Sequence, residues 1–271
     1  MLWFARLTAF SVLAGCAALP EGGVAFGLLG DTPYSEGEVE RLDRLIDDIN
    51  AVPLAFVVHV GDIGASRSQS CDDAWVVARK RQFARIRHSF VLVPGDNEWS
   101  DCRDPLGRLE RWRNLFCFEE KITGLVRQPG AFCEHLRWEA AGHVFITLNV
   151  PGSNNNLRHA EHAPRMAAVY AWLEEGAELA RSRDGLVILM QANPFITLPR
   201  DGFADLRRRL ELLGERMPGR VTLVHGDTHV YKDDEPLPGL RRIEVWGSPF
   251  VSWLPAAIAG GGIRTNGPRY R

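Results

Sequence analysis

The chain has 271 residues, of which 45% are hydrophobic and 24% are charged, and its formal net charge is −2. This composition is typical of a globular domain that is large enough to bury a core, and it excludes a disordered or fibrous protein. The Lys and Arg residues are spread along the sequence and form no basic block, so no nucleic-acid-binding surface is indicated.

The N-terminus has the pattern of an export signal. Arg6 precedes a mostly apolar run from Leu7 to Ala14, which is short for a membrane span and suits the core of a signal peptide. We therefore assign residues 1–20 to a signal peptide and 21–271 to a single domain. Leu13-Ala14-Gly15-Cys16 resembles a bacterial lipobox, which predicts a lipid anchor on Cys16 and a place in the cell envelope, membrane-anchored or periplasmic. A plain cleaved secretory signal is the alternative.

Apolar, β-branched runs alternate with amphipathic stretches along the rest of the chain. The runs predict buried strands at Val24–Leu29, Leu54–Val60, Phe90–Val93, Val144–Val150, Leu186–Met190, Val221–Val224 and Ile243–Trp246. Helices are predicted after Ser35, a candidate N-cap, and at Trp75–Arg87, Leu106–Phe116, Arg165–Arg181 and Leu206–Leu213. This alternation predicts a layered α/β fold, and the paired C-terminal strands favour mixed sheets over a barrel. The segment from Cys117 to His143 has no clear period and is expected to cross the surface.

Four cysteines lie beyond the signal segment: Cys71, Cys102, Cys117 and Cys133. In the oxidising compartment that export implies, they can form two disulfides with three possible connectivities. Because Cys71 follows one candidate site loop and Cys102 follows the next, we favour Cys71 with Cys102 and Cys117 with Cys133. Four buried free thiols are the alternative.

Four of the predicted strands are followed by the same dipeptide, Gly-Asp. The pairs are Gly30-Asp31, Gly61-Asp62, Gly95-Asp96 and Gly226-Asp227. Ligands bind beyond the carboxyl ends of strands in open α/β sheets, so we expect these carboxylates to meet in one crevice. Crowded carboxylates raise one another's pKa values unless cations neutralise them, which predicts a two-metal hydrolase site. For any single pair, a turn residue or a helix N-cap is the ordinary explanation.

The order of these motifs resembles the calcineurin-like metallophosphoesterase superfamily, over about Phe26 to Trp253. That family has, in order, Asp-x-His, Gly-Asp, Gly-Asn-His-Asp/Glu, a lone His before a Pro-containing loop, and Gly-His-x-His. This chain has Gly30-Asp31-Thr32-Pro33, Gly61-Asp62, Gly95-Asp96-Asn97-Glu98, Gln191-Ala192-Asn193-Pro194 and Gly226-Asp227-Thr228-His229. The resemblance implies a layered sandwich of two mixed β-sheets flanked by helices, and a metal-dependent hydrolase of phosphomonoesters or phosphodiesters.

The resemblance also implies six ligands for a pair of divalent ions. Asp31 would bind the first ion and Asp62 would bridge the two, while Asp96 replaces an Asn of the family. Gln191 would take the place of the lone His, with Asn193 as the alternative if the alignment shifts. The predicted ligands are Asp31, Asp62, Asp96, Gln191, Asp227 and His229.

Catalysis is assigned by the same resemblance to Asp62, Asn97 and His229. Asn97 occupies the position of the His that assists phosphoryl transfer, and Asn has no titrating proton for a leaving group. Substrate binding is predicted for Asn97 and for Asn154 and Asn155, whose amides crowd the end of a predicted strand. A plain polar turn at Asn154 and Asn155 is the alternative.

Two departures from the family pattern change the expected chemistry. Pro33 stands where the family has a His ligand, and a Pro side chain cannot bind a metal. The shift from His to Asp, Asn and Gln makes the site oxygen-rich, which favours Mn²⁺, Mg²⁺, Ca²⁺ or Fe over Zn²⁺. The expected partner is a small phosphorylated substrate. The alternative function is a catalytically silent lipoprotein that holds a metal or a phosphorylated ligand in the same crevice.

Three neighbouring residues have simpler predicted roles. His59 lies inside an apolar run and is expected to be a core histidine bonded to backbone. His225 is expected to be a strand-end residue, and the alternative is that it compensates for the catalytic His that Asn97 replaces. Trp99 is expected either to wall the pocket or to pack beneath the loop that Cys102 fixes.

Overall fold

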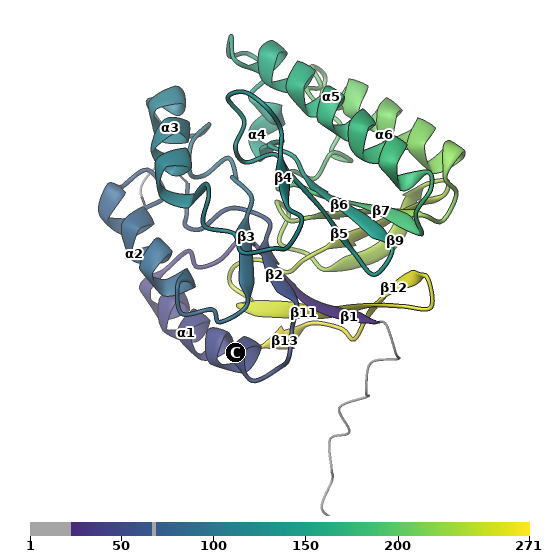
Figure 1. Ribbon diagram of the computed structural model, residues 1–271. Coiled ribbons are helices and arrows are strands. Elements are labelled where there is room, and N and C mark those ends of the chain that lie inside the picture. Colours follow the sequence, from purple (N-terminus) through teal and green to yellow (C-terminus); the bar gives the residue numbers. More distant parts are fainter. Residues whose placement is uncertain (1–22, 67–68) are drawn as a thin grey trace, which may run out of the picture.

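Two β-sheets form the centre of the molecule, with helices covering the outer face of each (Figure 1). The computed structural model describes residues 23–66 and 69–271, so the predicted signal segment and Cys16 lie outside the described residues. Within the described part of the chain, no helix is both long enough and apolar enough to cross a membrane. The predicted sandwich of two mixed sheets flanked by helices is confirmed.

The first sheet has a parallel half and an antiparallel half. Its strands, in spatial order, are β12 (Gly262–Thr265), β11 (Ser252–Ala259), β1 (Val24–Leu29), β2 (Phe56–His59) and β3 (Ser89–Leu92), and β13 (Arg269–Tyr270) also pairs with β11. β1, β2 and β3 are parallel neighbours, whereas β11 runs antiparallel to β1. The loops that follow β1, β2 and β3 therefore leave the sheet at the same edge.

The second sheet has the same kind of parallel centre. Its spatial order is β4 (Val126–Arg127), β5 (Leu136–Ala140), β6 (His143–Thr147), β7 (Gly185–Leu189), β8 (Val221–His225), β10 (Leu240–Glu244) and β9 (Lys232–Leu237). β6, β7, β8 and β10 are parallel, and the outer strands pair antiparallel.

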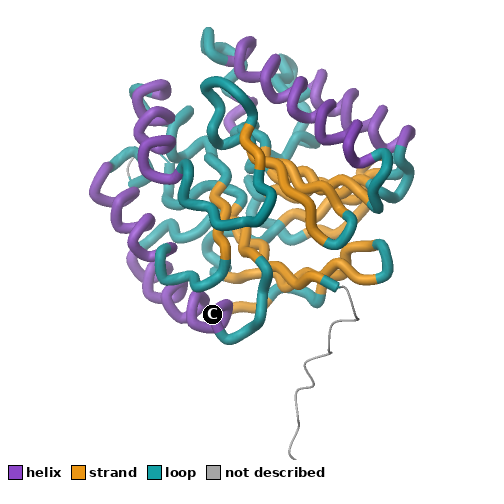
Figure 2. The backbone as a smooth tube through the Cα atoms, in the orientation of Figure 1, coloured by secondary structure: helices purple, strands orange, loops and turns teal. Residues whose placement is uncertain are grey.

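Helices cover the outer faces of both sheets, as the tube view in Figure 2 also shows. The first sheet is covered by α1 (Glu36–Asn50), α2 (Asp73–Phe83) and α3 (Pro105–Phe116), and the second by α5 (His162–Ala180) and α6 (Ala204–Arg216). The α1 helix begins as predicted, because the Ser35 side chain accepts a hydrogen bond from the Glu38 amide. Its buried face contains Leu42, Leu45 and Ile49, which share one side of the helix.

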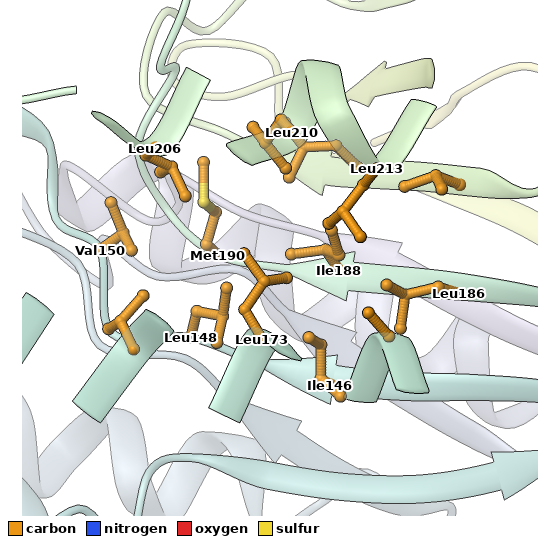
Figure 3. Packing of buried hydrophobic residues seen from close by; sticks show 14 of the residues in the cluster. Ile146, Leu148, Val150, Leu173, Leu186, Ile188, Met190, Leu206, Leu210 and Leu213 are labelled. Carbon is orange, nitrogen blue, oxygen red and sulfur yellow. The ribbon is translucent and has the colours of Figure 1, made fainter. Parts of the chain in front are cut away.

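Apolar side chains fill the layers between these elements. Between the sheets, Phe26 and Val58 pack with Phe145 and Val187, all fully buried. Outside the second sheet, Leu173 of α5 and Leu210 of α6 lie with the strand residues that Figure 3 shows, such as Ile146 and Ile188. Each such side chain contributes roughly 1.5–3 kcal/mol when it leaves water.

Two expectations about the sheets are corrected. The stretch from Cys117 to His143 is only partly a surface excursion, because it contains β4 and β5. In β5, Leu136 and Trp138 are buried and Glu139 is exposed, an alternation too short to stand out in the sequence. The strands β11, β12 and β13 were also not predicted, because the run around Pro255 lacks β-branched density and Pro is rare within a sheet.

Candidate metal centre

The candidate site lies where the strand ends of the two sheets meet. Asp31, Asp62 and Asp96 follow β1, β2 and β3, whereas Gln191 and Asp227 follow β7 and β8 of the other sheet. The Asp227 amide donates to Asp31 Oδ1 over 3.0 Å, and Gln191 Nε2 donates to Asp62 Oδ2 over 3.1 Å. These bonds cross from one sheet to the other, so residues that are far apart in sequence form one site.

The backbone is in the left-handed region at four of the site residues. The φ angles are 49° at Asp31, 61° at Asp62, 80° at Asp227 and 58° at His229. Residues other than Gly rarely adopt this region, and each such residue costs on the order of 1–3 kcal/mol. Backbone strain of this kind clusters at functional sites, where the surrounding structure holds it in place.

The glycines of the repeated dipeptide make room for the carboxylate of another motif. A Cβ on Gly95 would lie 1.9 Å from Asp62 Oδ1, and a Cβ on Gly226 would lie 2.0 Å from Asp31 Oδ2. Neither glycine has a positive φ, unlike Gly61 at 108°. The recurrence of Gly-Asp therefore reflects close approach between motifs as much as a sharp turn within each one.

Among the carboxylates of the candidate site, Asp62 accepts the most side-chain and backbone hydrogen bonds. Its Oδ1 accepts from the Asn97 amide over 3.1 Å, and its Oδ2 accepts from the Tyr34 hydroxyl over 3.1 Å as well as from Gln191. Tyr34 was not predicted from the sequence. It directly follows Pro33, and its hydroxyl accepts from Asn97 Nδ2 over 2.9 Å. The only sequence signal for Tyr34 is its place next to Pro33, the position at which the family has a His ligand. Its hydrogen bond to Asp62 can be seen only in the folded chain.

His229 is oriented as a ligand would be. Its Nδ1 lies 2.8 Å from the Ser248 carbonyl oxygen, so we assign the ring proton to Nδ1 and an open lone pair to Nε2. Nε2 lies 3.8 Å from Asp31 Oδ1. A ligating imidazole commonly donates its other N–H to a backbone carbonyl in this way. The Tyr34 ring packs edge-on against this imidazole, with 5.1 Å between ring centroids.

Asp96 and Asp227 each have one carboxylate oxygen that accepts a hydrogen bond from a loop of the second sheet. The Ser153 hydroxyl donates to Asp96 Oδ2 over 2.7 Å, and the Asn193 amide donates to Asp227 Oδ2 over 2.8 Å. Asp96 Oδ1 is buried and has no hydrogen-bond partner. A buried carboxylate oxygen without a partner is costly, and a cation would satisfy it.

Gln191 presents its amide nitrogen to the site. Its Oε1 accepts from the Gly152 amide over 2.5 Å, which turns Nε2 towards Asp62. In this geometry Gln191 is a hydrogen-bond donor to Asp62, and its predicted role as a metal ligand stays a prediction. Asn193 is the alternative to Gln191 as a ligand. Its side-chain Oδ1 accepts a hydrogen bond from the Phe195 amide over 3.0 Å, within the same loop.

The asparagines predicted to bind substrate are bonded within the protein. Asn97 Nδ2 donates to the Gly64 carbonyl over 2.9 Å in addition to Tyr34. Asn154 and Asn155 both bond the segment before α6, Asn154 at Arg200 and Gly202, and Asn155 at Gly202. These contacts suit the polar-turn alternative for Asn154 and Asn155, and their role in substrate binding stays a prediction.

Burial and mutual repulsion raise the pKa of every carboxyl group in the centre. Burial is the main cause, and neighbouring carboxylates add to it, so that the pKa of Asp96 rises to about 7 and that of Asp227 to about 6. The pKa values of Asp31 and Asp62 are raised well above the usual range for the same reasons. Burial also raises the pKa of Glu98, beside Asp62, to about 7. Bound cations would offset this cost by favouring the charged forms.

The donors are grouped in two places rather than around one point. Asp31 with His229 forms one group, and Asp96 with Asp227 forms the other, with Asp62 bonded from both sheets. Among the described residues, one group of three His, Cys, Asp or Glu side chains has its ligand atoms within 4.8 Å of one another. This group is Cys117, Cys133 and Glu134, where the two sulfurs form a disulfide, and it is not part of the candidate centre. The donor atoms of the centre are of the kind that binds hard cations, and the assignment of ligands stays a prediction.

Residues behind the centre have structural roles. His59 is fully buried, and its Nε2 lies 3.0 Å from the Thr32 carbonyl oxygen, so the prediction of a core histidine is confirmed. Trp99 is fully buried, with the Arg165 guanidinium 5.5 Å from its ring centroid, so its side chain is not exposed at the rim of the site. His225 is a buried strand-end residue, and burial lowers its pKa to about 4. Beside it, Glu244 accepts from Thr228 and from Lys232, the latter over 2.6 Å.

Both favoured disulfides are present. Cys71–Cys102 joins the loops that follow β2 and β3, with 5.7 Å between Cα atoms. Cys117–Cys133 joins the end of α3 to the segment before β5, with 6.0 Å between Cα atoms. The connectivity expected from the order of the site loops is therefore confirmed.

No protein-family profile matches this sequence, and no curated protein matches it. Solved structures do share its fold. A dimetal phosphatase from Danio rerio superposes with a TM-score of 0.64 at 13% identity, covering 90% of this chain and 96% of that one. GAP50, described as the anchor in the inner membrane complex of Plasmodium, gives 0.60 at 13% identity, covering 90% and 83%.

A 5′-nucleotidase precursor from Thermus thermophilus is similar over a smaller share of its own length. It gives a TM-score of 0.51 at 12% identity, and the match covers 92% of this chain but 54% of that protein. These neighbours are members of the calcineurin-like metallophosphoesterase superfamily. The chain therefore has the calcineurin-like metallophosphoesterase fold, as the order of its motifs predicted.

Proposed function

We propose that this protein is a metal-dependent hydrolase of phosphoesters with a two-ion site. The observation that carries the proposal is the buried Asp96 Oδ1, which has no partner and lies among carboxyl groups whose pKa values are raised by burial. A polar oxygen left in this state is best explained by a cation that joins it in the working protein. The shared fold with a dimetal phosphatase supports the same conclusion.

Each residue of the centre has a role in the proposed reaction. Asp31, Asp62, Asp96, Asp227 and His229 would hold the ions, and Gln191 would orient Asp62 through its amide nitrogen. Bound divalent ions would supply Lewis acidity and a water of lowered pKa. Asn97 would contact the phosphoryl group, and to do so its side-chain amide would exchange one of its bonds to Gly64 and Tyr34 for a bond to substrate.

The donor set favours hard ions. Four carboxylates and one imidazole offer mostly oxygen, which suits Mn²⁺, Mg²⁺, Ca²⁺ or Fe better than Zn²⁺. The nucleotidase among the structural neighbours supports a small phosphorylated substrate. We further propose that the protein is exported and anchored in the bacterial envelope through a lipid on Cys16, which the lipobox-like sequence supports.

Turnover by the purified protein tests the proposal. We expect Mn²⁺-dependent hydrolysis of a chromogenic phosphomonoester or phosphodiester, and a loss of at least about a hundredfold in Asp62→Asn, by analogy with removal of one strong electrostatic group. Asp205→Asn is the matched control, because Asp205 is exposed on α6 and the change is the same. Equal turnover by Asp62→Asn and the parent protein would contradict the proposal.

One observation favours a second candidate, a silent protein that binds a metal or a phosphorylated ligand. Asn97 stands at the position of the family's catalytic His. Its side-chain nitrogen, Nδ2, already donates hydrogen bonds to the Gly64 carbonyl and to the Tyr34 hydroxyl. The fold is also shared with GAP50, which is described as an anchor. Saturable binding of Mn²⁺ and inorganic phosphate, with no turnover of either chromogenic ester, would select this candidate.

A further inference from the structure

The segment after β6 contains a left-handed turn that is rare in proteins. Ser153, Asn154, Asn155 and Asn156 have consecutive φ angles of 45°, 58°, 55° and 50°. They belong to the short element α4 (Gly152–Asn155) and its end, and this element is not an ordinary helix. Left-handed backbone is tolerated by Asn but costs more at Ser153, so a function for that residue is indicated.

A buried arginine holds this turn in place. The Arg165 side chain, 2% exposed, donates through Nη1 to Asn155 Oδ1 over 2.8 Å and through Nη2 to the Asn155 carbonyl over 2.9 Å. Its Nη1 also donates to the Asn149 carbonyl, and its Nε donates to Glu161. Charge-assisted bonds of this kind are about twice as strong as neutral ones, so the turn is fixed from behind.

The turn places two hydrogen-bond donors at the candidate metal centre and brings Gly152 close to two of its carboxylates. The Gly152 amide donates to Gln191 Oε1, and the Ser153 hydroxyl donates to Asp96 Oδ2 over 2.7 Å. A Cβ on Gly152 would lie 2.8 Å from both Asp96 Oδ1 and Asp227 Oδ1, so the two oxygens lie close together beside Gly152 and leave no room for a larger residue there.

We propose, on the basis of the cation site in the proposed function, that Ser153 is a positioning residue that sets the orientation of Asp96 for an ion. Because the Ser153 hydroxyl is bonded to Oδ2, the other oxygen, Oδ1, lies near Asp227 Oδ1 without a hydrogen-bond partner. The Asp96 side chain, 7% exposed, has no other side-chain donor among the described hydrogen bonds. On this proposal the left-handed backbone at Ser153 is retained because the Ser153 hydroxyl orients the Asp96 carboxylate.

Calorimetric titration of the folded protein with Mn²⁺ alone tests this role without reference to turnover. We expect Ser153→Ala to raise the dissociation constant about tenfold, since a hydrogen bond to a charged group is lost. Ser153→Gly, which also relieves the left-handed strain, should show the same loss. Ser100→Ala is the matched control, because the Ser100 hydroxyl lies 3.5 Å from the backbone oxygen of Asp96 rather than from its carboxylate. It should bind Mn²⁺ as the parent does.

A double-mutant cycle separates positioning from a general structural effect. In an Asp96→Ala background, Ser153→Ala should change the dissociation constant by less than about twofold, because the carboxylate that it orients is gone. A full tenfold loss in that background, or no loss in the parent background, would overturn the role of Ser153 while leaving the proposed hydrolase intact. A parent protein that does not bind Mn²⁺ would overturn both.

Discussion

The two sheets contribute different things to the candidate metal centre. The first sheet supplies Asp31, Asp62 and Asp96, each placed directly by the end of a parallel strand. The second sheet supplies Asp227 and His229, and its loops also supply donors such as the Ser153 hydroxyl and the Gln191 amide. The first sheet therefore supplies three of the four carboxylates, and the second supplies the fourth together with donors that orient Asp62 and Asp96. The comparison also extends to how the loops are held, by a disulfide on the first sheet and by buried Arg165 on the second.

The largest expected effect concerns the disulfides. Removal of either one, as Cys71→Ser/Cys102→Ser or Cys117→Ser/Cys133→Ser, should lower the free energy of unfolding by about 3–4 kcal/mol, from the loop-closure entropy of 31 or 16 residues of separation. Only the first pair should also weaken Mn²⁺ binding, because it joins the loops that carry Asp62 and Asp96. Denaturant unfolding and calorimetry measure the two effects. Equal loss of Mn²⁺ affinity in both variants would remove the distinction between the two disulfides.

The buried carboxyl group of Asp96, after a strand of the first sheet, should make the stability of the protein depend on pH. Between the ordinary pKa of 3.8 and the folded value of about 7, Asp96 binds a proton in the folded protein that the unfolded chain releases. Its contribution to stability is therefore full below pH 4 and is lost as the pH rises through about 7. Buried histidines such as His59, whose pKa is lowered to about 4, act in the opposite direction as the pH falls below 6.5.

The difference between the ion-free parent and Asp96→Asn isolates the carboxyl group from those histidines. The variant should gain stability relative to the parent as the pH rises from about 4 to about 7. Thermal unfolding across this range provides the measurement. Saturating Mn²⁺ should stabilise the parent increasingly over the same range, because ligands bind metals in their deprotonated forms. A pH-independent difference between parent and variant would show that folding does not raise the pKa of Asp96.

The smallest effect tests the orienting role of the second sheet. In Gln191→Glu, a carboxylate oxygen replaces the amide nitrogen that donates to Asp62 Oδ2, and the Gly152 bond can remain. We expect the ion-free protein to lose about 1–3 kcal/mol, from one lost donor and added repulsion, and Mn²⁺ to restore most of that loss. Denaturant unfolding with and without Mn²⁺ measures both quantities. Unchanged ion-free stability would show that Gln191 does not hold Asp62.

Much of the first sheet's contribution could be predicted from the sequence. A buried run followed by Gly-Asp identifies a strand end, and parallel neighbours place such ends at one edge. The two disulfides followed from the order of the same loops. The strands β5 and β11 could not be predicted, because the first is short and the second contains Pro255 and several alanines, so pairing with neighbours decides their conformation.

The donors of the second sheet were harder to predict. Ser153 and Arg165 carry no motif of their own, and neither does Tyr34 of the first sheet. The contacts of Ser153 and Tyr34 with the site, and of Arg165 with the Asn155 turn, depend on packing between distant segments. Gln191 was identified as a candidate ligand, but the direction of its amide depends on the Gly152 amide, which the sequence does not reveal. Local patterns thus predicted where charge would gather, whereas the orientation of each side chain required the folded chain.

Diffraction from crystals grown with Mn²⁺, at a wavelength where manganese scatters anomalously, tests the central claim most directly. Two peaks are expected, one beside Asp31 Oδ1 and His229 Nε2 and one beside Asp96 Oδ1 and Asp227 Oδ1, each within about 2.0–2.6 Å of its oxygen ligands and with Asp62 between them. Crystals with bound manganese elsewhere, or with none at these oxygens at saturating Mn²⁺, would contradict the account.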